Sequence, residues 1–184
     1  GLCGLLRDEG RNDERDEYLT SIFKGASIDE KSKLFNIVKY RWNKIFTLNI
    51  DCLLEYIFEQ KGVPYKVWNR DNDDRRNNDS DTLIIKLHGC VNNSEAGYVF
   101  DDQEYINFWN DDDCFSRDFG DAYSKGDMIF IGTEFQEDDL KTIINKYSTK
   151  GYDLSGNNYF FISPQINNIR LKRQISAANN YYWI

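Results

Sequence analysis

The sequence predicts an α/β fold with a doubly wound parallel sheet and helices on both faces of that sheet. Short apolar runs alternate along the chain with segments whose apolar residues recur at helical spacing. The runs are too continuous for strands that bury only one face, which favours a parallel sheet covered on both sides. With 184 residues, 40% of them hydrophobic, the chain can bury about 70% of its unfolded surface, and we expect one domain over residues 1–184.

Six apolar runs are expected to form strands, because each is short, rich in β-branched and aromatic residues, and bounded by turn-forming residues. One further segment, "GYVFDD" (97–102), fits either a short strand or a turn. The six runs are "KIFTLN" (44–49), "YKVWN" (65–69), "TLIIKLHG" (82–89), "DMIFIGT" (127–133), "NYFFISP" (158–164) and "YYWI" (181–184).

Helices are expected between these strands wherever apolar residues return every three or four positions. In the first helix the apolar face would be Tyr18, Leu19, Ile22 and Phe23. Residues 70–81 are almost wholly Asp, Asn and Arg, so they predict a solvated loop. The expected helices span residues 13–24, 29–42, 51–61, 102–109, 113–123, 137–147 and 166–177.

The charge and hydropathy of the chain exclude two classes of partner. Lys and Arg number 23 against 31 Asp and Glu, which gives a net charge of −8 with no basic stripe, so we expect no direct contact with nucleic acid. No apolar run reaches the length of a membrane span, and the first twenty residues are too polar for a signal peptide. We therefore expect a soluble, cytoplasmic protein that does not engage a membrane.

The cysteines and the histidine limit the chemistry that the chain can perform. Cys3, Cys52, Cys90 and Cys114 stand far apart in the sequence and form no CxxC pair. They are also too few for a disulfide scaffold. His88 is the single histidine. We therefore expect no metal, and any step that needs an imidazole must use His88.

Polar residues gather where the predicted strands end, which is where open parallel sheets bind ligands. Each has a structural alternative. Asp51 could cap the following helix, Asn49 could form a turn, His88 could be a hydrogen-bonded structural residue, and Gly89 and Gly132 could be turn glycines. Their shared position at the carboxyl-end rim of the predicted sheet favours a ligand-binding site over these separate structural roles. The residues at this rim are Thr47, Asn49, Asp51, His88, Gly89, Gly132, Thr133 and Ser163.

The order of the segments "TLNID", "LHG" and "GT", with strand and helix between them, resembles the sirtuin family. The catalytic domain of that family binds NAD in a Rossmann-like sheet. The short spacing and the lack of zinc cysteines are more similar to the sirtuin-like domains of bacterial anti-phage defence proteins than to protein deacylases. "GVPYKVW", "KLHG", "QEY" and "IFIGTEFQEDDL" also look like that subgroup, and the likeness runs over about residues 42–164.

The resemblance implies roles for the rim residues. His88 would be the catalytic base, and Asn49 would orient the nicotinamide ribose and the attacking water or hydroxyl. Thr47 and Asp51 would line the nicotinamide-ribose pocket. An imidazole is the side chain most suited to proton transfer at neutral pH, and an Asn amide can hold a water as both donor and acceptor.

The resemblance also assigns the other half of the dinucleotide. Gly132 and Thr133 would approach the pyrophosphate or the adenosine ribose, and Ser163 would lie near the adenosine. The family's glycine-rich strand–turn is not found in the opening "GLCGLLRDEG". We therefore expect either a chain that begins after that motif, as part of a larger protein, or a domain without that phosphate loop.

The function that the resemblance implies is hydrolysis of NAD as substrate, which depletes NAD in an anti-phage defence context. Alternatives are a non-catalytic module that binds NAD or ADP-ribose, an NAD-dependent protein deacylase or ADP-ribosyl transferase, and an assembly domain without chemistry. The expected partners are NAD or ADP-ribose, additional domains of a parent protein, and further copies of the chain in a homo-oligomer.

Overall fold

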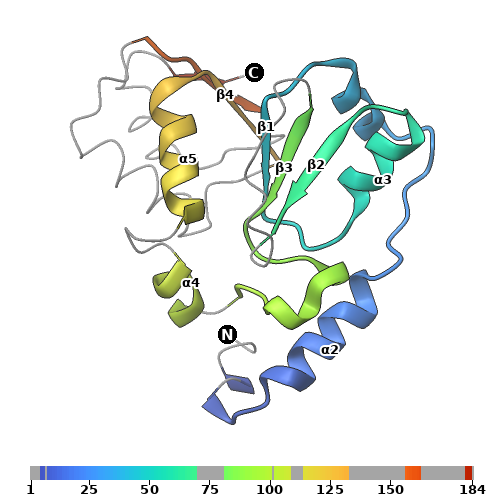
Figure 1. The fold of residues 1–184 in the computed structure, drawn as a ribbon, viewed down its shortest axis with the longest axis vertical. Helices are drawn as coiled ribbons and strands as arrows, with labels where there is room; N and C mark the ends of the chain where they lie inside the picture. Colours follow the sequence, from blue (N-terminus) through green and yellow to red (C-terminus); the bar gives the residue numbers. More distant parts are fainter. Residues whose placement is uncertain are drawn as a thin grey trace. The chain divides into compact units, whose positions relative to one another are not determined.

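The computed structural model describes residues 5–6, 8–69, 81–100, 102–108, 114–132, 156–162 and 181–183 (Figure 1). The chain divides into two compact units, Gly1–Tyr105 and Ile106–Ile184. Each unit is described by itself below.

The first unit is built on a three-stranded parallel sheet. Its strands are β1 (Lys44–Thr47), β2 (Tyr65–Trp68) and β3 (Thr82–Lys86), and their order across the sheet is β1-β3-β2. All five residues of β3 are buried, as expected for a central strand covered on both faces. The parallel pairing brings the carboxyl ends of the three strands to one edge (Figure 1).

Among the described residues, α-helices and short 3₁₀ helices accompany this sheet, and a further helix begins in this unit. Helix α3 packs against β2 and η1, and helix α2 packs against η2. Ile57 and Phe58 of α3 are fully buried, as are Ile84 and Ile85 of β3, so they belong to the core of this unit. The elements are α2 (Asn12–Phe23), η1 (Lys33–Lys39), α3 (Leu53–Gln60), η2 (Val91–Ala96) and α4 (Asp102–Phe108).

The buried face of α2 differs from the predicted one. Leu19 and Phe23 pack against a buried cluster as predicted, but Tyr18 and Ile22 are 65% and 51% exposed. Arg15 is buried instead, and its guanidinium donates to Asp16 and Glu104, each at 2.7 Å. Two carboxylates satisfy the charge of Arg15, so a cation can occupy a position that an apolar pattern assigns to a hydrophobic residue.

The helix predicted over residues 29–42 is wrong in type and length. The structure has only the 3₁₀ helix η1, which begins after Ser32, whose hydroxyl accepts the Leu34 amide at 3.3 Å. Upstream of it the Asp29 carboxylate accepts the Lys31 amide at 2.8 Å. Such local side-chain bonds compete with helix formation, which accounts for the later start.

The second unit holds another three-stranded parallel sheet, of order β4-β5-β6. Tyr123 and Tyr159 form part of its core, with ring centroids 4.7 Å apart, and the Tyr159 hydroxyl donates to the Tyr123 carbonyl at 2.6 Å. The predicted helices 137–147 and 166–177 lie outside the described residues, as does most of the loop 70–81. The elements are α5 (Cys114–Lys125), β4 (Met128–Ile131), β5 (Tyr159–Ile162) and β6 (Tyr181–Trp183).

All six predicted strands are present, and all the strand pairs are parallel. The predicted α/β, Rossmann-like fold class is therefore confirmed. The segment that fits either a short strand or a turn forms no strand over residues 97–100. Among the described residues, no helix combines the length and the apolar character that crossing a bilayer requires.

Candidate functional site

The first segment of the candidate site leaves the sheet at the end of β1. The Thr47 hydroxyl accepts the backbone N–H of Asn49 at 3.1 Å, and this local bond turns the chain away from the strand. The Asn49 side chain is exposed. Asn49 is therefore placed where its amide can meet a ligand from solvent.

Asp51 begins the approach to helix α3. One oxygen of its carboxylate accepts the backbone N–H of Leu53 at 3.0 Å, so Asp51 satisfies an amide at the start of the helix, although the N-cap position itself is Cys52 and not Asp51. Its backbone carbonyl accepts a hydrogen bond from the Lys86 ammonium. The side chain is half-buried, and its predicted contact with a ribose stays a prediction.

The second segment of the site follows β3 and carries His88. The imidazole is 5% exposed and meets Phe100 and Tyr105 edge-on, with centroids 5.9 and 5.3 Å away. The His88 carbonyl accepts the Val99 amide at 3.2 Å. These aromatic neighbours shield the imidazole from bulk solvent.

The register of the sheet relates the two segments. Thr47 of β1 pairs with Lys86 of β3, and the Leu87 amide donates to the Thr47 carbonyl at 2.9 Å. Asn49 and His88 each follow this pair by two residues. The two predicted catalytic residues therefore leave neighbouring strands at the same edge of the sheet.

A cavity of about 430 Å³ opens between these segments and helix α2, within the size range of small-molecule sites. Neither Asn49 nor His88 lines this cavity. Cys52, three residues after Asn49, and Cys90, two residues after His88, do line it. Its wall consists of Phe23, Gly25, Ala26, Cys52, Glu55, Tyr56, Glu59, Tyr65, Val67, Asn69, Cys90, Val91 and Asn92.

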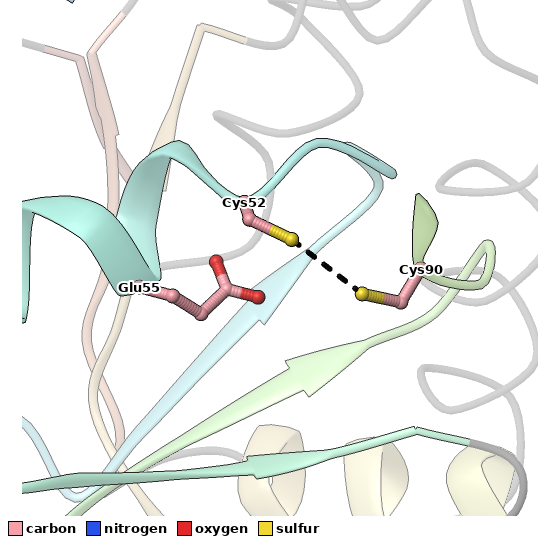
Figure 2. A group of neighbouring side chains, drawn as sticks. All are labelled: Cys52, Glu55 and Cys90. Atoms are coloured by element: carbon pink, nitrogen blue, oxygen red, sulfur yellow. Dashed lines mark hydrogen bonds between the residues drawn. The ribbon is translucent and has the colours of Figure 1, made fainter. Parts of the chain in front are cut away.

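Two cysteines face each other in the wall of this cavity. The Sγ atoms of Cys52 and Cys90 are 3.7 Å apart, and Glu55 lies beside them (Figure 2). The hydrogen bond from the Cys52 thiol lowers the pKa of Cys90 to about 6, a backbone bond with Asn92 and the charge of Lys86 act in the same direction, and burial opposes them. The same bond, together with burial, raises the pKa of Cys52.

A buried ion pair lies next to the two cysteines. The Lys86 ammonium, only 1% exposed, lies 2.9 Å from one oxygen of Glu55. Lys86 thus joins β3 to helix α3 through Glu55 and to the segment after β1 through the Asp51 carbonyl. Buried charges are retained only when they are paired in this way.

The predicted residues of the adenosine side fall in the second unit. Gly132 has a φ of 74° and its amide donates to the Ile162 carbonyl at 3.1 Å. Apart from its chain neighbours, no atom of the described residues lies within 4 Å of the position a Cβ would take. This positive φ agrees with the interpretation of Gly132 as a turn glycine at the end of a strand. Thr133 and Ser163 lie outside the described residues. The structure thus brings Thr47, Asn49, Asp51 and His88 together in one unit, and it holds Gly132 in the other.

Sequence reasoning missed four side chains near the site. Cys52 and Cys90 stand 38 residues apart, which gives no local sign of a pair, and the sequence pattern predicts only a helix for Glu55 and a strand for Lys86. One signal was present. Cys52 directly follows "NID" and Cys90 directly follows "HG", and residues that leave adjacent parallel strands meet at one edge.

A parallel α/β sheet with polar segments leaving adjacent strands defines a nucleotide-binding class of protein. The SIR2-like domain family matches residues 43–184 of this chain. The chain belongs to this family, and the predicted sirtuin-like domain is confirmed. The family includes enzymes that use NAD, which gives the chain an NAD-related role. A search of the curated proteins finds no match.

Proposed function

We propose that the chain hydrolyses NAD at its nicotinamide–ribose bond, with His88 as the base and Asn49 as the residue that holds the water. The observation that carries this proposal is the position of Asn49 and His88, which leave adjacent parallel strands two residues after the Thr47–Lys86 pair. Membership of the SIR2-like family supports NAD as the substrate.

The reaction needs little from the protein beyond placement and one proton acceptor. The C–N bond between ribose and nicotinamide breaks with both electrons going to nicotinamide, which leaves as a neutral molecule. A water oxygen forms the new bond to the same ribose carbon through an oxocarbenium-like state, and His88 takes the proton of that water. The products are nicotinamide, ADP-ribose and one proton.

The environment of His88 supports its role as the base. Phe100 and Tyr105 pack around the imidazole, so a proton accepted there meets little bulk water. Asn49, by contrast, presents its amide to solvent, where a water or a ribose hydroxyl can bind. The sugar would bridge the exposed amide and the buried ring. The likeness to anti-phage defence proteins supports depletion of cellular NAD as the purpose of this hydrolysis.

The proposal is tested by measuring nicotinamide release from NAD by the full chain and by two variants. His88→Ala is expected to lower the rate on the order of 10²–10⁴-fold, the usual contribution of a general acid–base group. Asn49→Ala, which removes the amide that holds the water, is expected to lower the rate as well. Asn43→Ala is the matched control, since Asn43 is also an exposed asparagine beside β1 but at its opposite end. It should leave the rate unchanged.

Thermal unfolding of each variant separates lost chemistry from lost fold. Full activity of folded His88→Ala or Asn49→Ala would show that the roles are assigned to the wrong residues. A thermal shift of the wild type with NAD or ADP-ribose, without nicotinamide release, would identify a binding module instead of an enzyme.

A further inference from the structure

We propose that Cys52, Glu55 and Cys90 form a binding site for a single Zn²⁺ ion. The three residues come from two segments of the first unit, the one that enters helix α3 and the one that follows β3 (Figure 2). The inference does not depend on NAD hydrolysis, because it rests on the donor atoms alone.

The distance between the two sulfur atoms fits a zinc ion. Zinc binds thiolates at about 2.3 Å in tetrahedral geometry, which puts two sulfur ligands about 3.8 Å apart. The Sγ atoms of Cys52 and Cys90 are 3.7 Å apart. Both thiols are already turned toward the space between them (Figure 2), so an ion can enter with no change in either backbone.

Glu55 supplies a third donor through the carboxylate oxygen that does not contact Lys86. One of its carboxylate oxygens is bound by Lys86 at 2.9 Å. The other oxygen is buried and makes no hydrogen bond within the part of the chain that the structure describes. A buried carboxylate oxygen without a partner is costly. The three donor atoms lie within 4.8 Å of one another, so a small rotation of Glu55 completes the ligand set.

The charges of the group also balance when both thiols lose their protons to a divalent cation. Two thiolates and one carboxylate carry three negative charges, and the Lys86 ammonium beside Glu55 cancels one of them. A Zn²⁺ ion cancels the remaining two, which makes the cluster neutral in a buried place. Buried charge is tolerated when it is compensated in this way.

The cavity leaves the ion accessible from one side. Cys52, Glu55 and Cys90 all line the 430 Å³ cavity, so the fourth position would be filled by water or by a ligand. Three protein ligands with an open position are typical of exchangeable or catalytic zinc. Bound zinc would also hold the segments that carry Asn49 and His88 at a fixed separation.

The site is tested on the reduced, metal-free full chain, titrated with Zn²⁺ alone and counted by elemental analysis after dialysis. One zinc per chain is expected. Co²⁺, used as a coloured substitute, should give the near-ultraviolet absorption of thiolate coordination. Cys52→Ser and Cys90→Ser should each weaken zinc binding by at least about 10-fold, the loss seen even for outer-shell partners. Glu55→Gln should weaken zinc binding but keep the thiolate absorption.

Cys114→Ser is the matched control, because Cys114 is a free cysteine in α5, outside the first unit. It should bind zinc as the wild type does. A measurement without variants covers the case in which a substitution unfolds the chain: zinc should protect Cys52 and Cys90 of the wild type from alkylation and leave Cys114 reactive. Equal alkylation of all three with and without zinc, or a reduced wild type that binds no zinc, would overturn the proposal.

Discussion

Gly89 directly follows His88 in a tightly packed turn. Its φ is 96°, and a Cβ there would lie 2.6 Å from the Gly97 carbonyl oxygen and 2.9 Å from a ring carbon of Tyr98. Gly89→Ala is therefore expected to lower the free energy of unfolding by about 3 kcal/mol, from the left-handed backbone and the steric overlap together. Chemical denaturation measures this loss.

Gly62→Ala is the control for the backbone contribution alone. Gly62 has a φ of 61°, but no atom lies within 4 Å of its Cβ position. The variant should lose only about 1 kcal/mol, the cost of a left-handed conformation. Equal losses at the two positions would show that the crowding around Gly89 is unimportant.

The pair of thiols makes the reactivity of Cys90 depend on pH. The thiolate is the reactive form, and the Cys52 hydrogen bond lowers the pKa of Cys90 to about 6. In metal-free protein, alkylation of Cys90 should therefore rise with a midpoint near pH 6, as followed by mass spectrometry. Cys52→Ala removes the donor and should move the midpoint upward, whereas a wild-type midpoint near 9 would contradict the bond.

The same shift predicts how the stability of the protein changes with pH. The pKa of Cys90 is lower in the folded state than its ordinary value of 9.0, so its contribution is present in full above pH 9 and is lost as the pH falls toward 6. Above pH 9 the raised pKa of Cys52 acts in the opposite direction. The free energy of unfolding should rise between pH 6 and 9 relative to a Cys52→Ala/Cys90→Ala variant, and then decline.

Single residues differ in how well the sequence predicted them. The contact of Asp51 with an amide at the start of α3 was predictable, because short acidic side chains before an apolar helix often accept such amides. The burial of His88 among aromatic rings and the meeting of Cys52 with Cys90 depend on contacts between distant parts of the chain. Those contacts have no local signature.

Among the elements, β3 contains an unusual feature for a central strand, which is the buried Lys86. Replacing it with methionine leaves the Glu55 carboxylate buried without its cation, so Lys86→Met should lower the free energy of unfolding by about 3–5 kcal/mol. Denaturant titration of zinc-free protein measures this. The double variant Lys86→Met/Glu55→Leu removes both charges and should recover most of the loss. A double variant as unstable as the single one would show that the ion pair is not the cause.

The strands were predicted more completely than the helices. Runs such as "TLIIK" are short, rich in β-branched residues and bounded by turn-forming residues, and together these features favour a buried strand over a helix. The sequence predicts a long α-helix where the 3₁₀ helix η1 lies, since the apolar spacing suits both types. That spacing does not show that the local bonds of Asp29 and Ser32 delay the start. The face of α2 was misassigned because Arg15 is neutralised by carboxylates, one of them 89 residues away.

The whole molecule carries a net charge of −8 with a sequence pI of about 4.7. Because nucleic-acid affinity comes chiefly from neutralising phosphates with basic side chains, duplex DNA and RNA should migrate unchanged in a gel when the protein is added at physiological salt. A strongly basic protein of similar size is the positive control. A shift that weakens as salt increases would reveal a basic surface that the composition does not indicate.

The class of the fold was predictable for the whole chain, and the arrangement within it was not. Alternation of strand and helix indicates a parallel sheet. It does not give the order β1-β3-β2, which depends on which strand inserts between the other two. The site followed from the fold class, because ligands of parallel sheets bind at one edge, while its zinc-binding residues required the strand order.

That order has a consequence for biosynthesis. The middle strand of the first sheet is the last of the three to be made, so on the ribosome β1 and β2 emerge without the neighbour that both of them pair with. The nascent chain must carry two unsatisfied strand edges until residue 86 has cleared the exit tunnel. Exposed edges of this kind invite wrong partners, so the protein is most vulnerable to aggregation, and most in need of chaperones, during its own translation.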